Sequence, residues 1–384
     1  MSSSSSLAGW RIWIAGIGGA GMSAYALLAH AWGAEVAGWD RVETPYLAHL
    51  GDVPFEIAPD PPEPPAGWEV YVSTAFAGRV AGRPRADLLA ELVSLRRSIV
   101  VAGAHGKTTT SAMIAFCLDR LGLDPAFLIG GEVPQLGGNA RAGEGWLVVE
   151  GDESDRSVAA LRPEIAVLLN VDLDHHTTFG SRAEVEALFE EWLSHVPKVV
   201  RAESLAPVEV QLAVPGEHNR RNAAAALAAL ELAGVEGAER VIGEFTGAGR
   251  RLQRHANGVF DSYAHHPAEI AADIAAVRNG GRVLALFQPH LYSRTSRLAH
   301  EFAVALATAD AVCVTEIYPA REEPVPGISG KLIVEELAQV RPGMRVGWAP
   351  SLEDAAAMVR GWARLGDTIL TLGAGDVDRA VELL

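Results

Sequence analysis

The sequence has little cysteine, no long apolar segment and no excess of basic side chains. Only two of its 384 residues are cysteines, Cys117 and Cys313, and both lie in apolar runs, so we expect buried thiols rather than a disulfide or zinc framework. No stretch of about 18 uncharged apolar residues occurs, which predicts no membrane span. The N-terminal serine tract is not followed by a basic and then an apolar region. We therefore expect no signal peptide and a cytoplasmic protein.

The charge of the chain limits its partners. There are 32 lysines and arginines against 48 aspartates and glutamates, a formal charge of −16. Such an acidic chain disfavours binding to nucleic acid or membranes. Separately, we expect small-molecule partners and a monomer or homodimer. Anionic ligands then require a local pocket of basic side chains and backbone N–H groups.

Strand-like and helix-like patterns alternate along the chain, which is long enough for two or three domains. Arg11–Ala15, Met22–Trp32 and Glu35–Trp39 predict a βαβ unit, and further units begin near Ser98 and Gly249. We therefore expect an α/β fold of three domains with mainly parallel sheets, and ligands at the carboxyl ends of the strands. The expected domains are residues 1–97, 98–246 and 247–384.

The segment GAHGKTTT, residues 103–110, follows an apolar β run and opens a helix. Its glycines let the backbone approach phosphate oxygens, while Lys107 can neutralise phosphate charge and a following hydroxyl can bind Mg²⁺. Val101 occupies the first glycine position of the full phosphate-loop pattern, so this loop is a shorter variant. A glycine-rich turn with an exposed lysine is the alternative, which the adjoining threonines disfavour.

A second glycine-rich loop, GIGGAG at residues 16–21, satisfies the dinucleotide-binding pattern, and Asp40 ends the next expected strand. The pattern predicts a diphosphate at a helix N-terminus without saying which nucleotide carries it. Taken alone, it supports a nicotinamide-dependent oxidoreductase with Asp40 on a ribose hydroxyl, or a purely structural turn.

Two further strands each end near a group that can bind a metal. Glu150 ends an apolar strand in VVEGDESD, and His175 follows another strand in NVDLDHH. A carboxylate oxygen suits Mg²⁺, whereas an imidazole is a less usual ligand and indicates a second metal site. The alternative is that these are solvated loop residues.

More candidates lie in the second half of the chain. Asn219, in PGEHN, either caps a helix or contacts adenine. Arg250 and Arg251 either reach a phosphate or form solvated surface charges. The segments 261–267 and 287–294, DSYAHHP and FQPHLYSR, concentrate His, Tyr and Arg, which suit recognition of carboxylates and nucleotides.

The ordered set of motifs resembles the Mur ligase family over nearly the whole chain. The motifs are GIGGAGMS (16–23), AGAHGKTTT (102–110), EGDESD (150–155), NVDLDHH (170–176), PGEHNRRN (215–222), GAGRRL (247–252), DSYAHHP (261–267), FQPHLYSRT (287–295), PGISGK (326–331) and LGAGD (372–376).

This resemblance implies a Rossmann-like UDP-binding domain, a P-loop ATPase-like central domain and a Rossmann-like C-terminal domain. It implies ATP and Mg²⁺ as cofactors, with ATP-dependent ligation of L-alanine to UDP-N-acetylmuramate through an acyl phosphate. Such chemistry depends mainly on positioning and charge neutralisation.

The resemblance also implies residue roles. The expected UDP-sugar ligands are Gly18, Gly19, Gly21, Ser23, Asp40 and Asn139; the ATP ligands are Gly103, His105, Gly106, Lys107, Thr108, Thr109, Asn219, Arg251, Tyr263 and His265; the metal ligands are Thr108, Glu150 and His175; and the catalytic groups are Lys107, His175, Arg251, His290 and Arg294.

The chain departs from the family pattern in several places. The stretch from Trp192 to Pro215 and the link from Arg251 to Asp261 are short, and Ser262 stands where the family often has a second aspartate. Leu291 replaces an arginine that usually follows the Pro-His pair. Besides the oxidoreductase, two alternatives remain: a muropeptide-recycling ligase that adds a tripeptide, and a non-catalytic relative that binds sugar nucleotides.

Overall fold

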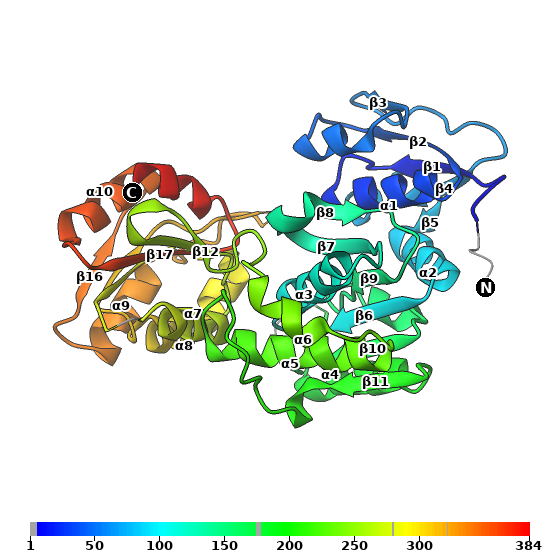
Figure 1. The fold of residues 1–384 in the computed structure, drawn as a ribbon. Coiled ribbons are helices and arrows are strands. Elements are labelled where there is room, and N and C mark those ends of the chain that lie inside the picture. The colour runs from blue at the N-terminus through cyan, green and yellow to red at the C-terminus, as the bar shows by residue number, and fades with distance from the viewer. Residues whose placement is uncertain (1–5, 174–177, 279, 321) are drawn as a thin grey trace. The chain divides into compact units, whose positions relative to one another are not determined.

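Three β-sheets follow one another along the chain, as the computed structural model shows (Figure 1). It describes residues 6–173, 178–278, 280–320 and 322–384. The strand orders are β3-β2-β1-β4-β5, β11-β10-β6-β9-β7-β8 and β12-β13-β17-β14-β15-β16. Among the described strands, β7–β8 and β12–β13 pair antiparallel and the other pairs are parallel. The expected α/β fold with mainly parallel sheets is confirmed.

The strands are short, from two to eight residues each. The first sheet has β1 (Arg11–Ala15), β2 (Glu35–Asp40), β3 (Phe55–Ile57), β4 (Glu69–Val72) and β5 (Arg83–Pro84); the second has β6 (Ser98–Ala102), β7 (Ala126–Val133), β8 (Gly138–Arg141), β9 (Leu147–Glu150), β10 (Ile165–Leu168) and β11 (Lys198–Arg201); the third has β12 (Gln253–Arg254), β13 (Val259–Ser262), β14 (Val283–Phe287), β15 (Ala311–Val314), β16 (Arg345–Trp348) and β17 (Thr368–Leu372).

Helices connect most of the parallel strands. They are α1 (Ala20–Ala31), α2 (Arg85–Leu95), α3 (Lys107–Arg120), α4 (Arg182–Leu193), α5 (Glu217–Leu232), α6 (Ala238–Val241), α7 (Pro267–Val277), α8 (Tyr292–Leu306), α9 (Lys331–Val340) and α10 (Leu352–Trp362).

Strand β6, at the centre of the second sheet, has no face exposed to solvent. Every residue of β6, Ser-Ile-Val-Val-Ala, is buried, and α3 is buried from Thr108 through Leu118. A continuous apolar run of this kind is typical of a parallel strand covered on both faces. Because β6 leads directly into α3, the loop between them lies at the carboxyl edge of the sheet, where ligands bind in open α/β folds.

The chain forms two compact units. Residues 1–212 and 220–245 make the first, and residues 213–219 and 246–384 make the second. In the first unit one hydrophobic core runs through both sheets, from Ile14 and Leu28 to Val100 and Val149, with α1 packed against β7 and β8. The three expected domain ranges remain a prediction, since the first two sheets belong to one unit.

One local expectation is corrected. Helix α5 begins at Glu217, so Asn219 lies in its first turn and is not its N-cap. Asn219 Nδ2 instead donates to the carbonyl of Pro215 at 2.7 Å. The short stretch 196–214 contains the edge strand β11 and a 3₁₀ turn, Ala202–Ser204, so it adds one strand to the second sheet.

The tight contact between β1 and β2 yields a first prediction. A Cβ atom on Gly38 would lie 2.6 Å from the carbonyl oxygen of Ile14 and 2.7 Å from Ile17 Cδ1. We expect Gly38→Ala to destabilise the first unit by about 1–3 kcal/mol, because the backbone of β1 must move.

Thermal unfolding measures this effect, with Gly180→Ala as the control in the same unit. A Cβ on Gly180 first meets the flexible Glu184 side chain at 3.4 Å, so that variant should unfold near the wild-type temperature. Equal melting temperatures for Gly38→Ala and wild type would contradict the packing described.

Candidate nucleotide and ligase site

The loop between β6 and α3 has the geometry of a phosphate cradle. Gly103 and Gly106 both adopt positive φ angles, 131° and 87°, which favour glycine. A Cβ on Gly106 would lie 2.5 Å from Asn222 Oδ1, and one on Gly103 would lie 2.9 Å from the Asn170 carbonyl. Because these glycines carry no side chains, a phosphate can approach the backbone at the start of α3. The N–H groups of a first helical turn attract phosphate.

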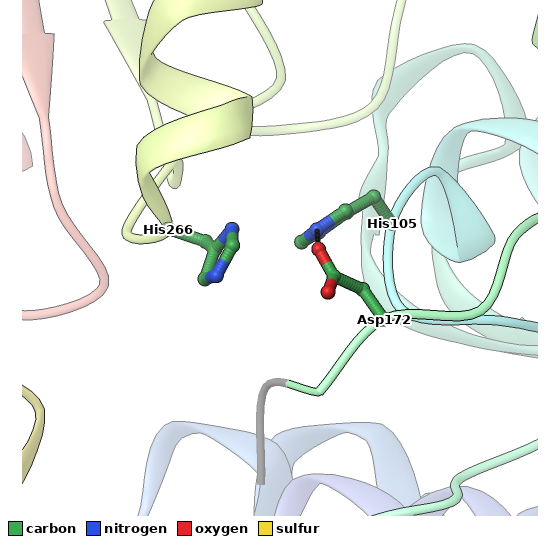
Figure 2. Close-up of side chains that lie close together, drawn as sticks. All are labelled: His105, Asp172 and His266. Carbon is green, nitrogen blue, oxygen red and sulfur yellow. Dashed lines mark ion pairs between the residues drawn. The ribbon is translucent and has the colours of Figure 1, made fainter. Parts of the chain in front are cut away.

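Asn170, which follows β10, braces this loop. Its side-chain oxygen accepts the His105 N–H at 2.9 Å, and its Nδ2 donates to the His105 carbonyl at 2.9 Å. The Ala104 N–H donates to the Asn170 carbonyl at 3.3 Å. His105 Nε2 lies 3.8 Å from the Asp172 carboxylate, an ion pair when the histidine is protonated (Figure 2). Sequence reasoning gave Asn170 no role, although its place after a strand beside the loop marks it.

Lys107 is held by a buried carboxylate. Its ammonium lies 3.1 and 3.0 Å from the two oxygens of Glu153 and donates to the Gly103 carbonyl at 2.6 Å. The Glu153 side chain is 4% exposed and that of Lys107 is 19% exposed. The lysine is thus fixed over its own loop, and a phosphate entering the loop would exchange with Glu153 as its partner.

Thr108 and Glu150 come together beside the lysine. The Thr108 hydroxyl donates to Glu150 Oε2 at 3.2 Å, and Gly130 N–H donates to Glu150 Oε1 at 2.6 Å. A hydroxyl and a carboxylate oxygen at this distance, next to a phosphate cradle, are hard ligands that fit Mg²⁺. His175, the third expected metal ligand, lies outside the described residues.

The glycine loop after β1 is closed by Asp40. The buried Asp40 carboxylate accepts the Gly18 N–H at 2.8 Å and the Arg41 N–H at 2.7 Å, while the Thr44 hydroxyl donates to the Gly18 carbonyl at 2.6 Å. A Cβ on Gly16 would lie 2.3 Å from the Ser73 hydroxyl. Asp40 therefore fixes the conformation of the loop through these hydrogen bonds.

Arg85, which sequence reasoning missed, connects this glycine loop with the central site. Its Nη1 lies 3.5 Å from where a Cβ on Gly21 would stand, and its Nη2 pairs with Asp155 at 2.7 Å and Asp152 at 3.3 Å. Burial raises the pKa of Asp155, but the hydrogen bonds from Ser157 and Arg85 outweigh it and leave that pKa lowered. A charged arginine thus lies between the start of α1 and the loop that carries Glu153.

The other expected UDP-sugar residues are in the same unit. Ser23 is buried in α1, where its hydroxyl donates to the Ala20 carbonyl at 3.2 Å. Gly19 precedes α1, and Asn139 is buried in β8, the strand that packs against α1. The loop, α1 and β8 therefore lie side by side, and the roles of these residues stay predictions.

In the second unit the two consecutive arginines differ. Arg250 Nε donates to the buried Asp261 at 3.0 Å, and its Nη1 and Nη2 donate to the carbonyls of Gly375 and Gly373 at 2.7 Å each. It ties the glycine turn after β17 to β13. Arg251 lies over the Tyr263 ring, with its Cζ 5.1 Å from the ring centroid.

Aromatic rings form a row beside these arginines. Tyr263 meets His265 edge-on at 5.3 Å, His265 meets His290 at 5.9 Å, and His290 stacks on Tyr318 at 5.9 Å. Arg294, 9% exposed, lies with Nη1 3.4 Å from His290 Nδ1. The structure thus brings together four expected site residues of the third sheet, and adds Tyr318, which sequence reasoning missed.

Leu291 takes a strained backbone conformation at the start of α8. Its φ is 71°, unusual for a residue with a side chain. Its N–H donates to the Tyr318 carbonyl at 3.0 Å, and its carbonyl accepts from Thr295 N and Oγ1 at 3.1 and 2.8 Å. These bonds hold the turn that places His290 and Arg294.

Fold and site together define a nucleotide-phosphate-binding protein of the three-sheet α/β class. The Mur ligase middle-domain model matches residues 101–202, and the model of the glutamate ligase domain of Mur ligases matches residues 250–375. The chain belongs to the Mur ligase family. In the described residues, none of the helices is long and apolar enough to cross a membrane.

Curated relatives are similar over nearly their full length. UDP-N-acetylmuramate–L-alanine ligase of Streptomyces coelicolor is 38% identical over 436 residues, covering 94% of each chain, and that of Rubrobacter xylanophilus is 36% identical, covering 97% and 99%. The 436 aligned positions exceed the 384 residues here, so this chain lacks segments that the relative has. The solved UDP-N-acetylmuramate–alanine ligase of Thermotoga maritima is 26% identical with a TM-score of 0.76, covering 97% of each chain.

The Lys107–Glu153 pair predicts a stability effect separate from catalysis. Lys107→Met removes the cation from a carboxylate that is 4% exposed, so we expect the first unit to lose about 3 kcal/mol of unfolding free energy. The double variant Lys107→Met, Glu153→Gln should recover most of that loss. Urea unfolding of the two variants measures this, and equal losses in both would argue against a buried ion pair.

Proposed function

We propose that this chain is an ATP-dependent ligase that joins L-alanine to UDP-N-acetylmuramate. The observation that carries the proposal is the phosphate cradle at the start of α3, with Lys107 and the Thr108–Glu150 pair beside it, in a member of the Mur ligase family. The relatives at 36–38% identity, all named as ligases of this type, support L-alanine as the amino acid added.

The residues of the chain suit phosphoryl transfer. The backbone of the cradle holds the phosphates, and Lys107 neutralises the charge on the group being transferred. Thr108 and Glu150 would hold Mg²⁺, which would neutralise further phosphate charge. The γ-phosphoryl group passes to the lactyl carboxylate, giving an acyl phosphate and ADP; the amine of alanine then attacks the acyl carbon, and inorganic phosphate leaves.

The other proposed contacts follow the division of the chain. The loop 16–21 and Asn139 would hold the UDP-sugar, while Asn219, Arg251, Tyr263 and His265 would serve ATP. His290 and Arg294 would serve the reacting carboxylate and amine from the third sheet. We also propose that the enzyme is cytoplasmic and works as a monomer or homodimer, without nucleic acid or membrane.

The alternatives explain less. A nicotinamide-dependent oxidoreductase accounts for the loop 16–21 but leaves the cradle and the Thr108–Glu150 pair without use. A tripeptide-adding ligase shares the fold: the murein peptide ligase of Psychrobacter arcticus has a TM-score of 0.60 at 21% identity, against 0.76 for the alanine ligase. A non-catalytic relative has no need of a lysine held over the cradle by a buried carboxylate.

An amino-acid-dependent turnover assay separates these functions. We expect ADP release that requires both UDP-N-acetylmuramate and an amino acid, fastest with L-alanine, slower with glycine or L-serine, and least with the tripeptide L-alanyl-γ-D-glutamyl-meso-diaminopimelate. Faster turnover with the tripeptide would reassign the chain to the recycling ligases. Hydride transfer with a nicotinamide cofactor would reject the ligase altogether.

Replacing the lysine of the cradle tests the ATP assignment. Lys107→Ala should lower turnover by several orders of magnitude, because a charge clamp on a transferred phosphoryl group contributes several kcal/mol. Calorimetry should still detect UDP-N-acetylmuramate binding with nearly the wild-type dissociation constant, and no NAD or NADP binding. Near-normal turnover in the variant would contradict the role of Lys107.

A further inference from the structure

A hydrogen-bonded serine and aspartate lie at the centre of the second unit, and the function proposed above does not use them. Ser262 ends β13, and its hydroxyl donates to Asp273 Oδ2 in α7 at 2.5 Å. The same hydroxyl accepts the Ala264 N–H at 3.1 Å. Ser262 is 1% and Asp273 8% exposed, so the pair connects a helix with the turn after β13 inside the protein.

Asp273 faces titratable groups on three elements, and burial lowers the pKa of one of them, His218. His218 Nε2, from the segment 213–219, lies 3.7 Å from Asp273 Oδ1. Arg251 attracts the negative carboxylate, and Glu269, one helical turn earlier, repels it. Burial raises the pKa of Asp273 to about 7, against the lowering effects of Ser262 and Arg251.

The segment that carries His218 is pressed onto α7. A Cβ on Gly216 would lie 2.8 Å from Ala276 Cβ and 2.7 Å from His218 Cε1, so only glycine fits there. The next residue after His218 is Asn219, whose side chain is bonded back to Pro215. Asp273 therefore contacts the segment 213–219 and the end of β13, and it interacts electrostatically with Arg251. These three parts of the chain carry residues proposed for ATP: Asn219, Tyr263 and Arg251.

We propose that Asp273 is a positioning residue for ATP, which acts through Ser262 on the turn 263–265 and through its carboxyl group on His218 and Arg251. The inference rests on the proposed function. It also assigns a role to Ser262, whose hydroxyl on β13 binds the carboxyl group of Asp273 on α7.

The pair has a property that a single buried residue lacks: its two members can exchange. Serine is one bond shorter than aspartate, so an aspartate at 262 facing a serine at 273 has the same combined length and the same hydroxyl-to-carboxylate hydrogen bond. Two carboxylates facing each other, or two hydroxyls, do not conserve the charge. Exchange therefore distinguishes a positioning pair from two independent buried residues.

The test compares wild type with Ser262→Asp, Asp273→Ser and the exchanged double variant. Calorimetry gives the dissociation constants for Mg-ADP and for UDP-N-acetylmuramate, and steady-state kinetics give KM for ATP and kcat. We expect each single variant to weaken Mg-ADP binding and raise KM for ATP about tenfold, as for a lost charged hydrogen bond. The exchanged variant should return to within about threefold of wild type, with UDP-N-acetylmuramate binding unchanged throughout.

Two more variants cover loss of folding. Asp273→Asn keeps the shape and an acceptor oxygen but no charge, so it should fold and still raise KM for ATP. Asp367→Asn is the matched control: its side chain is 7% exposed and paired with Arg282 at 3.1 Å, before β17. That variant should lower the melting temperature without moving KM for ATP.

The outcomes separate the inference from the function it rests on. Turnover by wild type together with wild-type Mg-ADP binding in Asp273→Asn and Asp273→Ser would overturn the inference alone. An exchanged variant as weak as the two single variants combined would also overturn it. A wild-type chain that binds no Mg-ADP would contradict the proposed function, and this inference with it.

Discussion

The bonds between Asn170 and the loop that precedes α3 are the interaction on which the central site depends. Asn170 binds both backbone groups of His105 and accepts the Ala104 N–H, so the loop cannot change shape without breaking three hydrogen bonds. The loop in turn sets where Lys107 and Thr108 begin the helix. Thr108 meets Glu150 at the end of the neighbouring strand β9, and Lys107 meets Glu153 in the loop that follows it. A site for phosphate chemistry gains from such pre-organisation, because groups already in place need no reorganisation during reaction.

The same arrangement recurs at the other two sheets. A glycine turn follows a central strand, and a polar side chain near an adjacent strand holds it: Asp40 accepts the Gly18 N–H, and Arg250, paired with Asp261 of β13, binds the carbonyls of Gly373 and Gly375. Glycines make these turns geometrically accessible but also loose, so each turn requires an external brace. Because the carboxyl ends of parallel strands meet at one edge of the sheet, a side chain at or near the end of an adjacent strand can reach each glycine turn.

The motifs were accessible from the sequence because each is local. The strand-loop-helix order around Lys107 and around Gly16–Gly21 is set by consecutive residues, and the structure has both elements where the pattern predicts them. The side chains that hold these loops in place could not be predicted from the sequence. Asn170 lies 65 residues from His105, and the pairing of β6 with β10 brings them together. Arg85 lies 70 residues from Asp155, and the packing of α2 against the 3₁₀ turn Ser157–Ala160 brings them together. Strand β7 was missed because two glycines interrupt its apolar pattern, and β8 was missed because its residues, Gly-Asn-Ala-Arg, form no apolar pattern.

Departures from a family pattern are best judged by what surrounds them. Ser262 lacks a carboxylate at a position where relatives often carry one, yet a carboxylate lies 2.5 Å away on α7. Leu291 lacks the charge of an arginine, but its backbone still makes the turn that sets His290 and Arg294, with φ at 71° sustained by Tyr318 and Thr295. At Ser262 the carboxyl group lies on the adjacent helix α7 instead of on β13. At Leu291 a charge is absent, but the backbone geometry of the turn is retained. We therefore expect a change in amino-acid preference to arise at Leu291. At Ser262 we expect ATP binding to be retained.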